Sequence, residues 1–257
     1  MPQIQEKIRE QYSELFEINK KLLLIGEKAF SRFEHPNTNR CDVIMALIAK
    51  TTRSHMAVIL LVKNGFGLES SNITRSMFED CVNLKYIFKN DNESRAKRYI
   101  KHRSVQKFFL LDKVKNKRRF KKVFPIKEYA ELKKEKEKFY KYYKKPDKFK
   151  WSGKSLKKLC KNVGFEQFYE IYYDVESHHP HAQPILMNKF IENITDDQQT
   201  FHAGPESDQQ EGYLISAFNW MSEMLLIASI FFNNKEMQDE LKDLHIGLEK
   251  IVAEKYI

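Results

Sequence analysis

Glycine and proline are scarce in this sequence, with only eight glycines and seven prolines among 257 residues. Stretches in which β-branched residues alternate with polar ones, the pattern of a half-buried strand, are also few. These absences disfavour sheet-rich folds, which need many tight turns. The chain length and a hydrophobic content of 42% suit one globular core. We therefore predict an all-α fold, a single-domain helical bundle of about eight to ten helices.

Cysteine is also scarce, and the three that occur, Cys41, Cys81 and Cys160, are widely spaced. No pair has the CxxC separation of a zinc knuckle or a redox dithiol, so we interpret all three as reduced and structural. The first residues, MPQIQEKIREQ, contain no apolar segment of the signal-peptide kind. Together these features predict a cytoplasmic protein without a cofactor.

Only one long hydrophobic run stands out, LISAFNWMSEMLLIASIFF at residues 214–232. It approaches the length of a membrane span, but Asn219, Trp220 and Glu223 interrupt it. A buried core helix is the favoured interpretation, and we expect no membrane association.

Apolar residues recur with helical periodicity along most of the chain. Breaks at HPNTN, NGFG, Pro125 and KKPDKFKWSGKS separate the segments. Ser207 and Gln210 resemble a capping box before the last long apolar helix, and a loop is expected around TFHAGPESDQQ. The predicted helices span residues 4–33, 41–62, 68–89, 92–123, 127–143, 155–161, 165–177, 213–232 and 236–254.

The helix predicted at residues 41–62 is apolar nearly all round, apart from Lys50 and the cluster TTRSH. Such a helix belongs at the centre of a bundle. Arg53 and His55 are therefore candidates for buried polar positions, which need hydrogen-bond or charge partners.

Positive charge is concentrated in one part of the chain. Residues 101–161 contain 24 Lys or Arg against six Asp or Glu, whereas the remaining residues contain 21 against 29. Aromatic residues alternate with lysines in KEKFYKYYKKPDKFKW, a composition that suits RNA or single-stranded nucleic acid. A solvated helix whose aromatic residues face the core is the alternative. The candidate nucleic-acid-binding residues are Lys133, Lys134, Lys141, Tyr142, Lys144, Lys145, Lys148 and Lys150.

Arg75, Glu79 and Asn83 are spaced at i, i+4 and i+8, so they share one face of the helix predicted at residues 68–89. This polar stripe is either exposed or the inner wall of a polar site. In the second case, Arg53 from the neighbouring helix could pair with Glu79.

The stretch YDVESHHPH at residues 173–181 places Tyr173, Ser177 and His181 on a similar line. A metal site is disfavoured because adjacent histidines point apart on a helix, and no established ligand spacing is present. A serine nucleophile is disfavoured because no nucleophile elbow or oxyanion-hole motif accompanies Ser177. Metal-independent RNA cleavage needs only a histidine for proton transfer and an arginine that stabilises phosphorane charge.

Arg95 and His102 form a second candidate pair, with six residues between them. Ribonucleases of the HEPN superfamily use an Arg followed by a His at four to six residues, and this short pattern resembles theirs. A charged helix face produces the same pattern by chance, so this pair is a second choice.

Several longer pieces carry a stronger resemblance: TTRSHMAVILLVKNGFGLESSNITRSMFEDCVNLKYIF, then WSGKSLKKLCKNVG, then YYDVESHHPH. Together, over residues 40–190, they resemble domain-of-unknown-function family 5677, a largely bacterial family. The resemblance implies an all-helical fold but no established reaction. The positions that match its pattern are Arg53, Arg75, Ser76, Glu79, Asn83, Trp151, Gly153, Tyr173, Ser177 and His181.

Two functional hypotheses follow. The first is a toxin or phage-defence type protein that acts on RNA, with a metal-independent catalytic cavity whose residues are Arg53, Arg75, Glu79, Asn83, Tyr173, Ser177 and His181. The second is a non-catalytic helical module that binds nucleic acid or an acidic partner. Neither requires a metal, and a homodimer is compatible with both.

Overall fold

A computed structural model describes residues 2–33, 36–90, 93–120, 122, 124–143, 150–170, 190–195, 198–201 and 203–256. These residues contain ten α-helices, which confirms the all-α bundle and its helix count. The first five are α1 (Pro2–Gln11), α2 (Ser13–Arg32), α3 (Asn39–Lys63), α4 (Gly67–Phe88) and α5 (Glu93–Val114). The others are α6 (Ile126–Tyr143), α7 (Leu156–Val163), α8 (Glu166–Phe168), α11 (Glu211–Phe231) and α12 (Lys235–Tyr256). A 3-10 turn, η1 (Arg118–Phe120), follows α5.

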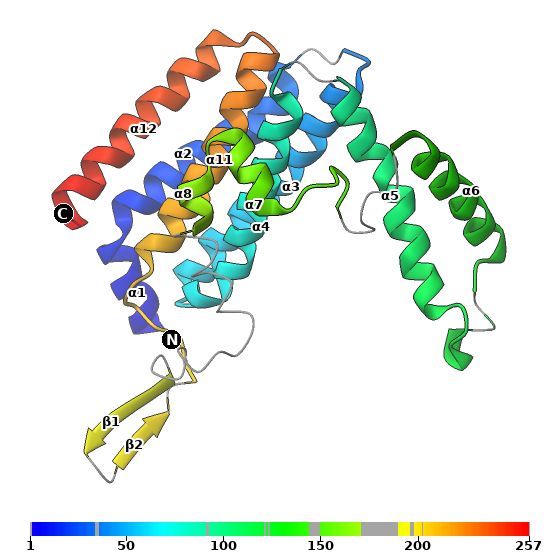
Figure 1. Ribbon diagram of the computed structural model, residues 1–257. Helices are drawn as coiled ribbons and strands as arrows, with labels where there is room; N and C mark the ends of the chain where they lie inside the picture. The colour runs from blue at the N-terminus through cyan, green and yellow to red at the C-terminus, as the bar shows by residue number, and fades with distance from the viewer. Residues whose placement is uncertain are drawn as a thin grey trace.

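Helices α3, α4 and α11 pack against one another at the centre of the bundle, and α2 lies against α3 and α11 (Figure 1). Their contact faces carry large side chains that are fully buried, including Phe78, Leu84 and Phe218. Removing each such side chain from water contributes about 1.5–3 kcal/mol to folding. The apolar character of these helices therefore accounts for their central position.

Helices α3 and α11 are each long and apolar enough to cross a membrane, judged by length and composition alone. In the bundle both pack against α4, and much of each helix is buried inside the protein. Such packing favours the core-helix interpretation of residues 214–232. The expectation of no membrane association stays a prediction.

Most helix boundaries fall close to the predicted ones. Helix α3 ends where NGFG predicts, with Gly65 in the left-handed region at φ +81°. The capping box is wrong: α11 begins two residues earlier than expected, at Glu211, and Gln210 is itself the N-cap without a side-chain cap bond. The Gln210 amide instead donates to the carbonyl of Asp208, at 3.0 Å.

Three other segments depart from the prediction. The first helix divides at Tyr12, whose buried hydroxyl donates to the carbonyl of Ser207. Helix α5 ends at Val114 instead of continuing to residue 123. Strands β1 (Ile191–Thr195) and β2 (Gln198–Phe201) form an antiparallel hairpin that includes the start of the predicted loop. The part of the predicted helix at residues 165–177 that follows Glu170 lies outside the described residues.

The expectation of a buried polar position is right for His55 and wrong for Arg53. His55 is fully buried, with Nε2 at 2.6 Å from Oδ1 of Asn19 and Nδ1 at 2.6 Å from Sδ of Met221. The Asn19 amide nitrogen donates to the carbonyl of Leu15, so its oxygen is the acceptor and the His55 proton sits on Nε2. Arg53 is only two residues away but lies on the opposite side of α3, where its side chain is exposed.

The three cysteines are buried and form no disulfide bond, as expected of structural thiols. Burial raises the pKa of Cys160 to about 12, and burial raises the pKa of Cys81 as well. Because the thiolate is the reactive form, these two side chains are poor nucleophiles at neutral pH.

Helices α5 and α6 form an antiparallel hairpin that leans away from the bundle (Figure 1). Its two helices are joined by packing of Phe108 on Tyr129 and of His102 on Phe139. The turn between the helices lies far from the central helices α3 and α4 (Figure 1). The hairpin therefore presents most of its surface to solvent.

Candidate functional site

The polar stripe on α4 includes an ion pair between Arg75 and Glu79, with Nε at 3.7 Å from Oε1. Both side chains are partly exposed, 22% for Arg75 and 42% for Glu79. Glu79 therefore pairs with an arginine of its own helix and not with Arg53, the expected partner. A half-exposed pair of this kind contributes at most about 1 kcal/mol to stability.

Asn83, the next residue of the stripe, connects α4 to the segment that follows α6. Its side-chain oxygen accepts a hydrogen bond from Nε1 of Trp151 at 2.7 Å, and its amide donates to the carbonyl of Glu79. The Trp151 ring is 8% exposed and packs edge-on against Tyr99. Thus two separate pieces of the family-like pattern, the α4 stripe and the W-x-G element, are in direct contact.

Replacing Asn83 with leucine should lower the free energy of unfolding by about 1–3 kcal/mol, because the buried Trp151 indole would lose its acceptor. Urea denaturation followed by circular dichroism measures this change. Arg75→Ala on the same stripe is the matched control and should cost less than about 1 kcal/mol. If both variants lose the same free energy of unfolding, the Asn83–Trp151 hydrogen bond contributes no more to stability than the exposed ion pair does.

Asp80 is a buried acidic residue that the sequence pattern did not single out. It is 6% exposed, and its carboxylate lies 2.6 Å from Nζ of Lys50 on α3. Burial raises the pKa of Asp80, although Lys50 opposes this shift. Burial and the nearby Asp80 also raise the pKa of Tyr99 to about 12. The available sequence signal was Lys50 itself, one of the few cations in a largely apolar helix, since such a cation favours a nearby carboxylate.

The predicted catalytic cavity is only partly described. Arg75, Glu79 and Asn83 do share one face of α4, but Arg53 is exposed, and the ion-pair partner found for Glu79 is Arg75. The remaining members, Tyr173, Ser177 and His181, lie outside the described residues.

The second-choice residues Arg95 and His102 both make structural contacts. Arg95 donates to the carbonyl of Tyr86 at 2.6 Å, near the end of α4, and its guanidinium lies 4.2 Å from the centre of the Tyr86 ring. His102 is 2% exposed and packs against Phe139 of α6. These contacts give each residue a packing role. Within the described residues, no group of three His, Cys, Asp or Glu is arranged to hold a metal ion.

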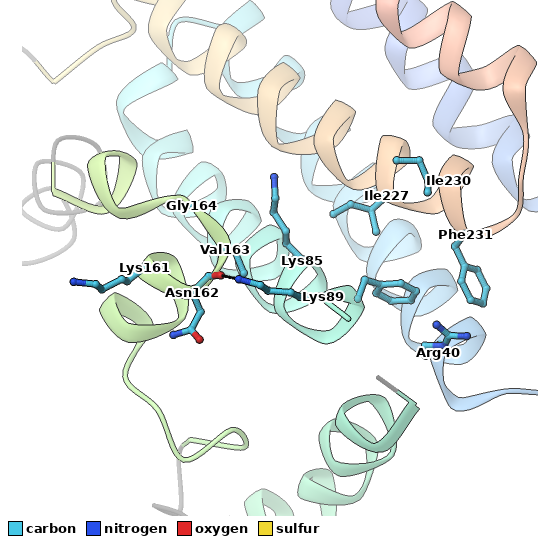
Figure 2. A pocket seen from close by; sticks show the side chains of 11 residues that line it. Arg40, Lys85, Lys89, Lys161, Asn162, Val163, Gly164, Ile227, Ile230 and Phe231 are labelled. Carbon is cyan, nitrogen blue, oxygen red and sulfur yellow. Dashed lines mark hydrogen bonds between the residues drawn. The ribbon is translucent and has the colours of Figure 1, made fainter. Parts of the chain in front are cut away.

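A groove of about 780 Å³ lies where α4, α7 and α11 end. Figure 2 shows Lys161 and Asn162 on one side, Phe231 and Arg40 on the other, and Lys85 and Lys89 between them. The other lining residues are Phe88, Val163, Gly164, Ile227 and Ile230.

The cations around this groove are already engaged. Lys85 pairs with Glu223, Arg40 with Glu93, and Lys161 with Glu166. The Lys89 ammonium donates to the carbonyl of Asn162 in the last turn of α7. Because each helix C-terminus carries a partial negative charge of about one half, three such ends offset much of the remaining positive charge. We therefore assign no anionic ligand to this groove.

The largest excess of positive charge lies on the α5–α6 hairpin. Residues 93–143 contain 19 Lys or Arg and six Asp or Glu, and the ten residues 113–122 contain seven Lys or Arg and no acidic residue. We call residues 113–122 the hairpin tip. Its described basic residues, Lys113, Lys115, Lys117, Arg118, Arg119 and Lys122, are all exposed.

The base of the hairpin tip is held by Asp112. Its carboxylate lies 2.7 Å from the ammonium of Lys115 and accepts a hydrogen bond from the Tyr129 hydroxyl at 2.6 Å. Hydrogen bonds from Lys115 and Tyr129 lower the pKa of Asp112. Two large apolar side chains of this region are also exposed: Phe120 exposes 45% of its surface and Ile126 exposes 74%. The residues predicted to bind nucleic acid lie further along the chain, from Lys133 to Lys150, and do not include the tip.

Among the predicted nucleic-acid-binding residues, Lys133, Lys134, Lys141, Tyr142 and Lys150 are exposed. On α6, however, four glutamates between residues 128 and 137 alternate with the lysines and reduce the local charge. Lys144, Lys145 and Lys148 lie outside the described residues.

Comparison with known proteins returns one relationship. A family model with the description "Family of unknown function (DUF5677)" matches residues 42–200, more than half of the chain. This range contains the α4 stripe, the α5–α6 hairpin and Trp151. No curated protein and no solved structure matches the chain.

Proposed function

Because the chain belongs to the DUF5677 family, whose description assigns no reaction, we propose a function from the surfaces of this protein: a cytoplasmic protein that binds single-stranded nucleic acid through the α5–α6 hairpin. The observation that carries this proposal is the hairpin tip, with seven basic residues in ten and no acidic one. The tip extends away from the bundle, so a polyanionic strand can reach it from several sides (Figure 1).

Electrostatics and composition both support a nucleic-acid ligand. Lysine and arginine side chains neutralise backbone phosphates and release the counterions that surround them. Exposed aromatic residues on the same hairpin, including Phe120 and Tyr142, offer flat surfaces on which unpaired bases stack. An acidic protein would also satisfy the charges and pack on the rings, and failure to bind RNA at 50 mM salt would favour it.

Catalysis stays a prediction. RNA cleavage of the toxin or phage-defence type requires a residue for proton transfer, and the residue proposed for it, His181, lies outside the described residues. Of the described residues assigned to that cavity, Arg75 and Glu79 form an ion pair, and Asn83 accepts a hydrogen bond from Trp151. A homodimer likewise stays a prediction.

A binding titration tests the proposal. A fluorescently labelled 20-nucleotide single-stranded RNA, titrated in EDTA between 50 and 200 mM salt, should bind with a slope of log K against log salt of about −3 to −5. That slope corresponds to about four to seven phosphate contacts at 0.7 per contact. Absence of binding at 50 mM salt contradicts the proposal.

The same reactions, analysed on a denaturing gel, report cleavage. Intact RNA supports the binding module. Cleavage that is lost in His181→Ala and Glu79→Ala variants would instead support the metal-independent nuclease.

A further inference from the structure

A cleft of about 510 Å³ lies between the first turns of α5 and the end of α6. It is lined by Glu93, Ser94, Lys97, Lys101, Tyr142 and Tyr143. Two cations therefore face two aromatic side chains across a space large enough for one nucleotide.

The geometry points to this cleft as a subsite for one unstacked nucleotide of a single strand, with its base against a tyrosine ring and its phosphate on Lys97 and Lys101. This inference rests on the proposed function and adds the reason why the ligand would be single-stranded. In a duplex the bases are paired and stacked inside the helix, so none could enter the cleft.

Lys97 and Lys101 are suited to hold a phosphate. They are one helical turn apart on α5, so their side chains project from the same face, and both are exposed. Glu93, the acidic residue of the lining, accepts hydrogen bonds from the backbone and side chain of Asn39 at the start of α3. Although burial alone would raise the pKa of Glu93, the hydrogen bonds from Asn39 and Arg40 lower it. The Glu93 carboxylate is thus engaged by hydrogen bonds at the start of α3.

The two tyrosines differ in a way that suits base stacking. Tyr143 lies under the guanidinium of Arg98, at 5.1 Å from the ring centre, which fixes the ring in place. Tyr142 exposes 76% of its surface, so a base can cover its ring without displacing core residues. One rigid wall and one accessible ring form a cleft that a flat base can enter.

The test compares three ligands: 20-nucleotide oligo(A) RNA, the matching oligo(dA) DNA, and a 20-base-pair RNA duplex. Tyr142→Ala should weaken binding of the single strands at least fivefold, while duplex binding and the salt slope stay unchanged. Tyr142→Phe should restore single-strand binding, because it keeps the ring. Lys97→Gln with Lys101→Gln should weaken single-strand binding and reduce the salt slope by about 0.7, because the two lysines hold one phosphate.

The variants distinguish binding at the cleft from binding at the hairpin tip. If Tyr142→Ala leaves single-strand binding unchanged while glutamate substitutions of Lys117, Arg118 and Arg119 at the hairpin tip weaken it, the subsite is wrong and the proposed function stands. If Tyr142→Ala weakens single-strand and duplex binding equally, the cleft does not select single strands. Equal affinity for RNA and DNA identifies base and phosphate as the recognised groups, whereas tighter RNA binding adds the 2′-hydroxyl. Failure of the wild-type protein to bind any ligand overturns both proposals.

Discussion

Replacing Lys117, Arg118 and Arg119 with glutamate should weaken single-stranded RNA binding by about 100-fold at 0.1 M salt and reduce the salt slope by about 2. The change in slope follows from three lost phosphate contacts at about 0.7 each. Between 1 M and 0.1 M salt, a difference of 2 in the slope amounts to a 100-fold difference in affinity. Fluorescence anisotropy titrations at several salt concentrations measure both quantities. These side chains are exposed, so the fold should be unaffected.

The matched control reverses three cations elsewhere on the protein. Lys235, Lys242 and Lys250 lie on α12, are exposed, and change the net charge by the same amount when replaced with glutamate. We expect this variant to lose less than about threefold in affinity, because the field of distant charges is screened within about 10 Å. Equal losses in the two variants would mean that net charge alone drives binding, and the hairpin would then not be the interface.

The helices could be predicted from the sequence because their determinants are local. The apolar stripe of residues 4–33 gives the start of α1 and the end of α2 nearly as observed, and the glycine at Gly65 gives the end of α3. The division at Tyr12 depends on a hydroxyl that reaches Ser207, which is distant in the sequence. The β1–β2 hairpin was missed because its strands have only five and four residues, too few to show a clear alternation.

The candidate site shows the same division between local and long-range determinants. The i, i+4 spacing places Arg75 and Glu79 together, and this pair is observed. The partner of Asn83, by contrast, is Trp151, 68 residues away. Periodicity on a helix identifies which residues share a face, but it does not identify what lies opposite that face. For the same reason, the pairing of Lys50 with Asp80 could not be predicted.

The apolar character of α3 correctly placed the helix at the centre but did not distinguish which polar residues face inward. His55 points toward α2 and α11, where Asn19 and Met221 contact both ring nitrogens. Its burial lowers its pKa from 6.5 to about 3. The folded protein therefore keeps His55 neutral over a wide pH range.

Lowering the pH from 6.5 to 5 should cost the folded state about 2 kcal/mol through His55 alone. The folded-state pKa is depressed, so below pH 6.5 the unfolded chain binds a proton that the folded protein does not bind. The stability contributed by neutral His55 is fully present above pH 6.5 and is lost as the pH falls toward 3. The slope is at most about 1.4 kcal/mol for each pH unit. Urea denaturation at pH 7, 6 and 5 measures this loss.

His55→Gln isolates the contribution of this residue, because glutamine does not titrate and its amide can still donate to Asn19. The variant should be less stable than the wild type at pH 7, since glutamine fits a histidine site imperfectly. Its stability should nevertheless change less between pH 7 and 5, so the two curves should converge by about 2 kcal/mol. Parallel curves would mean that His55 is protonated equally in the folded and unfolded states. The description of His55 as a neutral side chain shielded from water between α2 and α11 would then be wrong, since only a group shielded from water resists protonation at pH 5.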